Sequence, residues 1–150
     1  MTVSVQEEKR SSELRYTFVD SEQKQRHYRI TPSSNDLELV MLRISVGNHK
    51  ATSAIVNVDE QAAELRDFAR GKYFPLNVID AAEEVGAPEN PADEQYLEFL
   101  WNPTLIDGTS QAFDLQQGFS INGWMLFEAP KDTRFRELRW RAGDSLTITF

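Results

Sequence analysis

The sequence predicts an all-β fold, an antiparallel sandwich of the immunoglobulin-like type with about seven to nine strands. Short segments of alternating or β-branched residues recur along the chain, glycine, proline, asparagine and aspartate separate them, and few stretches have a helical period. A chain of 150 residues fits one domain with a sizeable core. We assign residues 14–150 to that domain. Met1–Glu13 is polar and short of large apolar residues, so we expect a flexible leader there.

The most strongly marked stretch is Gly118–Pro130, which reads GFSINGWMLFEAP. Trp124 to Phe127 are four consecutive large apolar residues, and neighbouring side chains of a strand point to opposite faces. We therefore predict a central strand that is covered on both sides and ends at Pro130.

The second long apolar element is Asp36–Val46. Val40, Leu42, Ile44 and Val46 share one parity, and the other parity is apolar from Leu37 to Met41, until Arg43 and Ser45. This pattern predicts a strand buried on both faces at its start and on one face later. Gly47–Lys50 has turn residues, and Ala51–Val58 is expected to return beside the first strand as a hairpin.

Shorter strands are predicted on either side of these elements. Leu14–Asp20 and His27–Ile30 alternate, and the first places Leu14, Tyr16 and Phe18 on one face. Near the C-terminus, Phe135–Trp140 turns Leu138 and Trp140 inward, and a last strand ends at Phe150.

Asp59–Gly71 supports two predictions. Asp59 is a good helix N-cap, the following residues are helix formers, and Gly71 suits the position after a helix. The alternative is a strand at Ala63–Asp67, a tight turn through Arg70 and Gly71, and a return strand over 72–78.

The acidic stretch Asp80–Glu94 carries a glycine and two prolines and is interpreted as a loop or insertion, with at most a helical turn at Ala81–Val85. Gln95–Trp101 is dense in aromatic residues and is interpreted as a strand, with a short helix from Pro91 as the alternative.

The chain resembles a family of immunoglobulin-like domains of unknown function from bacterial and archaeal secreted proteins and surface lipoproteins, sometimes labelled telomeric-repeat-binding-factor-like. The resemblance rests on Leu65, Asp67, Gly71 and Tyr73, and on two glycines followed by a hydrophobic pair and Phe-Glu-x-Pro. The last motif is Gly118, Gly123, Met125-Leu126 and Phe127-Glu128-Ala129-Pro130. The resemblance favours the hairpin over the helix at Asp59–Gly71 and implies an extracellular or cell-surface location. It supplies no catalytic residues.

Composition excludes several functional classes. The chain has no cysteine, which rules out disulfides, thiolate zinc sites and a cysteine nucleophile. A net charge of −8 argues against a nucleic-acid binder, and no apolar run is long enough for a membrane span. Met1–Glu13 lacks the pattern of a signal peptide, so a cytoplasmic location stays open beside the extracellular one. We expect no cofactor.

Candidate ligand-binding residues come from two features. Trp101 follows a predicted strand beside Asn102 and Pro103, which makes it the tryptophan most suited to exposure; Trp124 and Trp140 are expected in the core. Arg136, Arg139 and Arg141 belong to a basic stretch, and the last two face away from Leu138 and Trp140. Such a stripe suits an anionic partner, although charges that guard an edge strand against aggregation are the simpler explanation.

Other constellations are weaker. Acidic residues dominate 59–98 and would suit Ca²⁺, but their spacing matches no calcium loop and a solvated acidic surface is the simpler explanation. His27 and His49 lie in or beside predicted turns and form no ligand pair.

These observations favour a non-enzymatic extracellular or surface-associated module with an accessory, adhesion or ligand-binding role, whose partner is a protein or a glycan. Two alternatives remain, a hydrolase that uses carboxylates of the 80–98 region and a Ca²⁺-stabilised adhesion domain.

Overall fold

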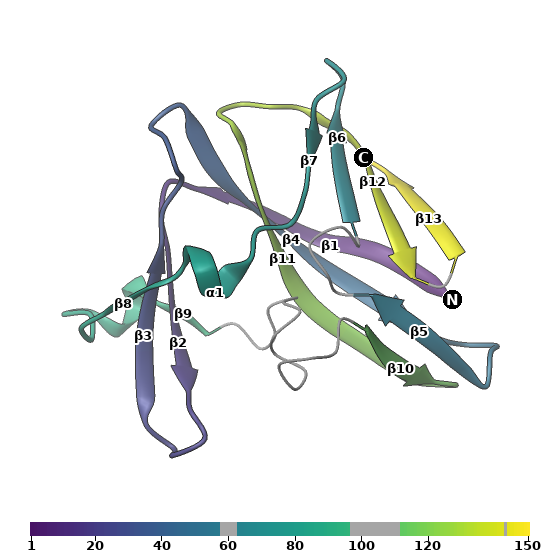
Figure 1. Ribbon diagram of the computed structural model, residues 1–150, viewed down its shortest axis with the longest axis horizontal. Coiled ribbons are helices and arrows are strands. Elements are labelled where there is room, and N and C mark those ends of the chain that lie inside the picture. The colour runs from purple at the N-terminus through teal and green to yellow at the C-terminus, as the bar shows by residue number, and fades with distance from the viewer. Residues whose placement is uncertain (58–62, 97–111, 143) are drawn as a thin grey trace.

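The computed structural model describes residues 1–57, 63–96, 112–142 and 144–150 (Figure 1). Strands make up 59% and helices 6% of the structure, and nearly all strand pairs are antiparallel, so the all-β prediction is confirmed. Two short helical segments occur in the acidic stretch, α1 (Val78–Ala81) and the 3₁₀ turn η1 (Pro91–Asp93).

The strands follow one another as β1 (Thr2–Ser11), β2 (Leu14–Val19), β3 (Gln25–Ile30), β4 (Leu37–Gly47), β5 (Ser53–Asn57), β6 (Ala63–Asp67), β7 (Lys72–Tyr73), β8 (Glu83–Val85), β9 (Gln95–Tyr96), β10 (Ala112–Gln116), β11 (Ser120–Pro130), β12 (Phe135–Ala142) and β13 (Asp144–Thr149). They form sheets in the orders β1-β4-β11, β10-β5, β13-β12-β6-β7 and β8-β3-β2-β9. In the last sheet β2 and β9 run parallel.

Strands β4 and β11 form a wall with a hydrophobic core on each side. In β11, Met125 and Phe127 enter the larger core, shared with β6 and β12, whereas Trp124 and Leu126 enter the smaller core, shared with β2, β3 and α1. Figure 1 shows the β2–β3 hairpin on one side of this wall and β6, β12 and β13 on the other. The prediction that Trp124 to Phe127 are covered on both faces is confirmed.

The burial predicted for β4 is also confirmed. Leu39 and Met41 lie in the smaller core, Val40 and Leu42 lie in the larger one, and Arg43 ends the double burial. The prediction of a central strand at Gly118–Pro130 is wrong, because in the order β1-β4-β11 of the described strands it is β4 that lies in the middle and β11 lies at an edge.

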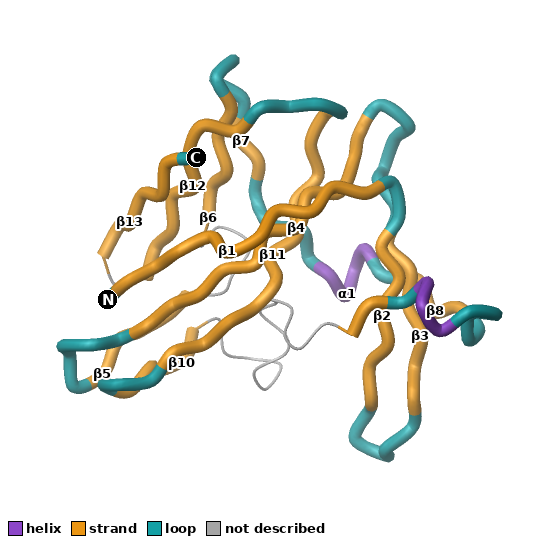
Figure 2. The backbone as a smooth tube through the Cα atoms, turned by 180° about the vertical axis from the view of Figure 1, so that it is seen from behind, coloured by secondary structure: helices purple, strands orange, loops and turns teal. Residues whose placement is uncertain are grey.

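The N-terminal segment differs from the leader predicted for Met1–Glu13. Residues 2–11 form β1, which pairs antiparallel with β4 along its whole length (Figure 2). Met1, Val3 and Val5 pack against the larger core. Further along, the Lys9 ammonium lies 5.1 Å from the ring centre of Trp124. A few modest apolar side chains at period two, together with the ladder hydrogen bonds, suffice to order this polar segment.

The hairpin predicted between β4 and Ala51–Val58 is wrong. Strand β5 instead pairs antiparallel with β10, and β4 pairs antiparallel with β11. The segment 37–57 therefore lies beside the segment 112–130 through two successive strand pairs. Asn48 fixes the junction between the ladders. It is buried, and its side-chain amide donates to the carbonyls of Ala51 and Leu115, at 2.9 and 2.8 Å.

The strand predicted at Ala63–Asp67 is confirmed, but the return strand predicted over 72–78 is shorter, because β7 covers only Lys72 and Tyr73. β6 and β7 form a tight hairpin in which Arg70 adopts a positive φ of 71°, and Leu65 is buried in the larger core. Residues 58–62, which include the predicted N-cap Asp59, lie outside the described ranges.

Candidate functional site

The outer face of β12, β6 and β7 gathers four basic side chains and two carboxylates. Cross-strand partners share a face of a sheet, and the register places Arg139 opposite Glu64, Glu137 opposite Arg66, and Arg66 opposite Lys72. The same register turns Leu138 and Leu65 into the core. We call this surface the arginine face; it comprises Glu64, Arg66, Lys72, Arg136, Glu137 and Arg139.

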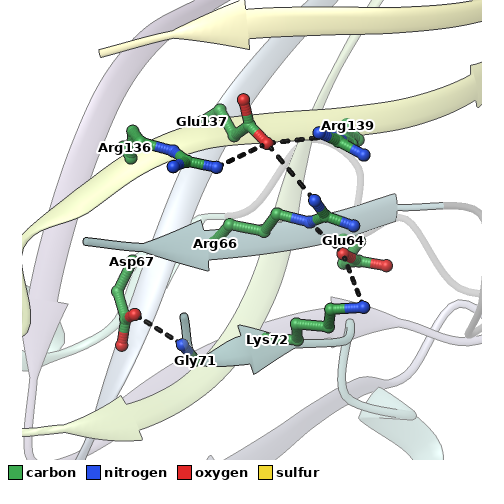
Figure 3. A network of polar contacts seen from close by, with 8 residues as sticks. All are labelled: Glu64, Arg66, Asp67, Gly71, Lys72, Arg136, Glu137 and Arg139. Carbon is green, nitrogen blue, oxygen red and sulfur yellow. Dashed lines mark hydrogen bonds and ion pairs between the residues drawn. The ribbon is translucent and has the colours of Figure 1, made fainter. Parts of the chain in front are cut away.

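Glu137 is the hub of the arginine face (Figure 3). One carboxylate oxygen, Oε1, lies 2.9 Å from Arg139 Nε, 3.3 Å from Arg136 Nη2 and 3.6 Å from Arg66 Nη1. Partial burial alone raises the pKa of Glu137, but the hydrogen bonds and charges of Arg136 and Arg139 outweigh it and lower that pKa below its ordinary value. The carboxylate is therefore held ionised between cations.

A positive excess remains after this internal pairing. Glu64 contacts Arg66 and lies 3.8 Å from Lys72. The carboxylates of Glu64 and Glu137 are thus shared among the four cations of the face, which leaves two positive charges in excess. The Arg136 and Arg139 side chains stay 46% and 47% exposed while Glu137 is only 13% exposed. The cations thus reach solvent in front of the carboxylate that positions them, which is suitable for contacting an anion.

The sequence-predicted ligand residues divide into two groups. Arg136 and Arg139 lie together on the arginine face and point outward, as the prediction for Arg139 required. The backbone of Arg141 continues β12, but its side chain and the whole of Trp101 lie outside what the structure describes. Trp124 and Trp140 are core residues, 8% and 1% exposed, as expected.

Beside the arginine face, Asp67 closes the β6–β7 turn. It is a buried carboxylate that accepts hydrogen bonds from Gly71 N at 2.6 Å and Tyr73 Oη at 2.8 Å. The bond from Tyr73 is the main reason that the pKa of Asp67 lies below its ordinary value. A Cβ at Gly71 would lie 2.4 Å from Asp67 Oδ2. Three of the four residues of the Leu-Asp-Gly-Tyr motif therefore contact one another and stabilise the turn that carries Lys72.

The acidic stretch shows no calcium site in its described part. Glu83 contacts Arg29 at 2.8 Å and Glu84 contacts Arg26 at 3.0 Å, so these carboxylates join β8 to β3. Across residues 1–57, 63–96, 112–142 and 144–150, no three His, Asp or Glu side chains are grouped as metal ligands. Glu98 lies outside these ranges.

The histidines are placed differently from each other. His49 is exposed and its Nε2 lies 3.0 Å from the Thr2 hydroxyl. His27 is not in a turn but in the middle of β3, where its Nδ1 lies 2.7 Å from Glu94 Oε1. The two partners are 67 positions apart, so no local spacing in the sequence indicates the contact.

None of the helices in the described ranges has the length and apolar composition needed to cross a bilayer. No family model, no curated protein and no solved structure matches the chain.

Proposed function

We propose that this chain is a non-enzymatic, surface-associated or extracellular binding module that recognises an anionic glycan or protein surface through its arginine face. The observation that carries the proposal is the outward excess of cations around Glu137, on a chain whose net charge is −8. A net charge of −8 repels an anionic ligand at long range, whereas the excess of cations on the arginine face attracts it there, so the charge distribution orients the encounter.

The construction of the face supports recognition of carboxylate or sulfate groups. Arg136 and Arg139 present planar guanidinium groups, which donate paired hydrogen bonds to such anions. Their contacts with Glu137, at 3.3 and 2.9 Å, hold the two groups on the same strand without covering them. Less side-chain entropy is then lost when a ligand binds.

The immunoglobulin-like assignment belongs to the same proposal. Two features support it: β4 and β11 pack face to face against β6 and β12 over the larger core, and the motif residues of the resemblance occupy structural positions in that layer. The extracellular or surface location rests on the resemblance.

The test measures binding of a sulfated oligosaccharide and of its desulfated counterpart by calorimetry. The double variant Arg136→Gln/Arg139→Gln is expected to bind the sulfated ligand at least about tenfold more weakly, since two charge-assisted contacts are lost. The control Arg15→Gln/Lys24→Gln removes the same charge from the β2–β3 hairpin and should stay within about twofold of the parent. An equal loss of affinity in both variants would show that binding depends only on net charge, which would contradict the proposal.

A further inference from the structure

A cavity of about 410 Å³ lies at the β2–β3 hairpin, on the opposite side of the β4–β11 wall from the arginine face. Its polar lining comes from Thr17 on β2, Gln25 and His27 on β3, and Glu94 after η1; Pro88 and Pro91 supply apolar walls. The volume falls within the range of small-molecule sites, about 300–1,000 Å³. Both prolines are conformationally restricted, which favours a preformed wall.

The contacts within the cavity fix the state of His27. Its Nδ1 lies 2.7 and 3.0 Å from the two carboxylate oxygens of Glu94, and an ionised carboxylate only accepts hydrogen bonds. Nδ1 therefore carries the proton, and in the neutral imidazole Nε2 keeps its lone pair as an acceptor. The Glu94 side chain is 9% exposed and that of His27 is 18% exposed, so the pair is largely withdrawn from bulk water.

Thr17 completes the arrangement from the Nδ1 side. Its hydroxyl donates to Glu94 Oε2 and lies 3.4 Å from His27 Nδ1. In a hydrolytic triad the nucleophile contacts the imidazole nitrogen opposite the carboxylate, so that the imidazole takes its proton. Here the hydroxyl and the carboxylate share one nitrogen, so the cluster is organised for binding rather than for nucleophilic attack by Thr17.

The polar groups of the cavity are rich in acceptors. Glu94 has lone pairs beyond those that His27 and Thr17 use, His27 offers Nε2, and Gln25 contributes its amide oxygen. Glu94 also gives the cavity a negative charge. The neighbouring charges on the same sheet face are paired among themselves: Arg29 contacts Glu83 at 2.8 Å and Arg15 contacts Glu13. Among the described lining residues there is no lysine or arginine to supply a cation with N–H donors.

We propose that this cavity binds a small primary alkylammonium group, with the N–H donors on Glu94 and His27 Nε2 and the alkyl stem against Pro88 and Pro91. The requirement for an acceptor at Nε2 makes binding dependent on a neutral His27. Protonation of the imidazole removes that acceptor and adds a positive charge beside the ligand, so a proton competes with the ammonium. A free amine and the side chain of a lysine share this chemistry.

The experiment follows His27 by imidazole NMR during titration with n-butylammonium chloride. The chain has only two histidines, so the variant His49→Gln leaves His27 as the single imidazole. Saturable shifts are expected wherever the same spectra record a neutral His27, and they are expected to be lost where the spectra record a protonated one. n-Butyltrimethylammonium has the same charge and no N–H donor, and should leave the spectrum unchanged. Nα-acetyl-lysine methylamide distinguishes the sources: a response to it assigns the cavity to lysine side chains as well as free amines.

Two results would overturn the proposal without any variant at the site. One is the absence of a saturable shift with both primary ammonium compounds; the other is an equal response to the trimethylated compound. In a variant shown by its circular dichroism to remain folded, His27→Phe removes the acceptor and should weaken the response of the Glu94 side-chain carboxyl carbon to n-butylammonium, and a response of unchanged affinity would equally contradict the inference.

Discussion

The two cores on either side of the β4–β11 wall differ in size and in what surrounds them. The larger core joins three sheets, β1-β4-β11, β10-β5 and β13-β12-β6-β7, and contains Phe127, Phe135 and Trp140. The smaller core joins a single hairpin and α1 to the wall and contains Tyr16 and Trp124 at its margin. The arginine face lies on a sheet supported by the larger core, and the cavity lies on a hairpin supported by the smaller one. We therefore expect the two proposed binding surfaces to rest on supports of unequal stability.

The largest expected effect comes from the larger core. Phe127 is fully buried, and Phe127→Ala is expected to lower the free energy of unfolding by about 3–5 kcal/mol, because a cavity forms between two sheets that cannot close on it. Denaturant melts followed by circular dichroism measure it. Cooperative loss of the whole fold is expected; a loss below about 1 kcal/mol would mean that these sheets are not packed on one another.

The neighbouring residue probes the other side of the wall. Leu126 is 1% exposed in the smaller core, and Leu126→Ala is expected to cost about 2–3 kcal/mol, at the lower end for such changes because one hairpin can move inward. Hydrogen exchange should accelerate mainly in β2, β3 and α1. Acceleration spread evenly over β6 and β12 as well would show that the cores are not separable.

A smaller effect is expected at the turn beside the arginine face. Gly71→Ala places a Cβ 2.4 Å from Asp67 Oδ2 and is expected to cost about 1–2 kcal/mol, since the Asp67 contacts must shift. Gly86 is the matched control, because nothing lies within 4 Å of its Cβ position and Gly86→Ala should be neutral or slightly stabilising. Thermal melts compare the two; identical midpoints would remove the proposed role of the Asp67–Gly71 contact.

Acid should act on the side of the larger core. The hydrogen bond from Tyr73 lowers the pKa of Asp67 in the folded state, so its contribution is present above the ordinary aspartate pKa, about 3.9, and is lost as the pH falls through the lowered value. Stability measured across this acid range should fall less steeply in Asp67→Asn than in the parent. Parallel curves would show that Asp67 is not linked to folding.

Alkali should act at Tyr16 in the smaller core. Burial, and then the nearby Tyr28, raise the pKa of Tyr16 to about 12. The neutral phenol is thus favoured by folding, and its contribution is complete below the unfolded-state value of about 10 and lost as the pH rises through about 12. Tyr16→Phe should remove this alkaline loss, which ultraviolet titration of tyrosinate and stability measurements above about pH 10 both record. An unchanged alkaline slope in the variant would contradict it.

Burial could be predicted from the sequence where apolar residues are consecutive or alternate regularly along a strand. Trp124 to Phe127 predict a strand between two cores because every position is apolar, and the parity of Leu138 and Trp140 predicts the outward direction of Arg139. At 59–71 the local residues also allowed a helix, and it was the resemblance that favoured the β6–β7 hairpin found in the structure.

Other features depend on contacts that the sequence does not encode locally. β1 was missed because its inward residues, Val3 and Val5, are few and only half buried. The β5–β10 pairing joins strands from opposite halves of the chain, and composition does not distinguish it from a local hairpin. The His27–Glu94 contact is equally remote in sequence, and the pairing of Glu137 with Arg136 and Arg139 depends on rotamers as well as register.

The most direct test of the account is to map by NMR where a sulfated oligosaccharide contacts the folded protein. The proposed function predicts saturable shifts at Arg66, Lys72, Arg136 and Arg139, on the side of the larger core, and no change in the β2–β3 hairpin. Shifts centred on the β2–β3 hairpin, or none that saturate, would contradict it.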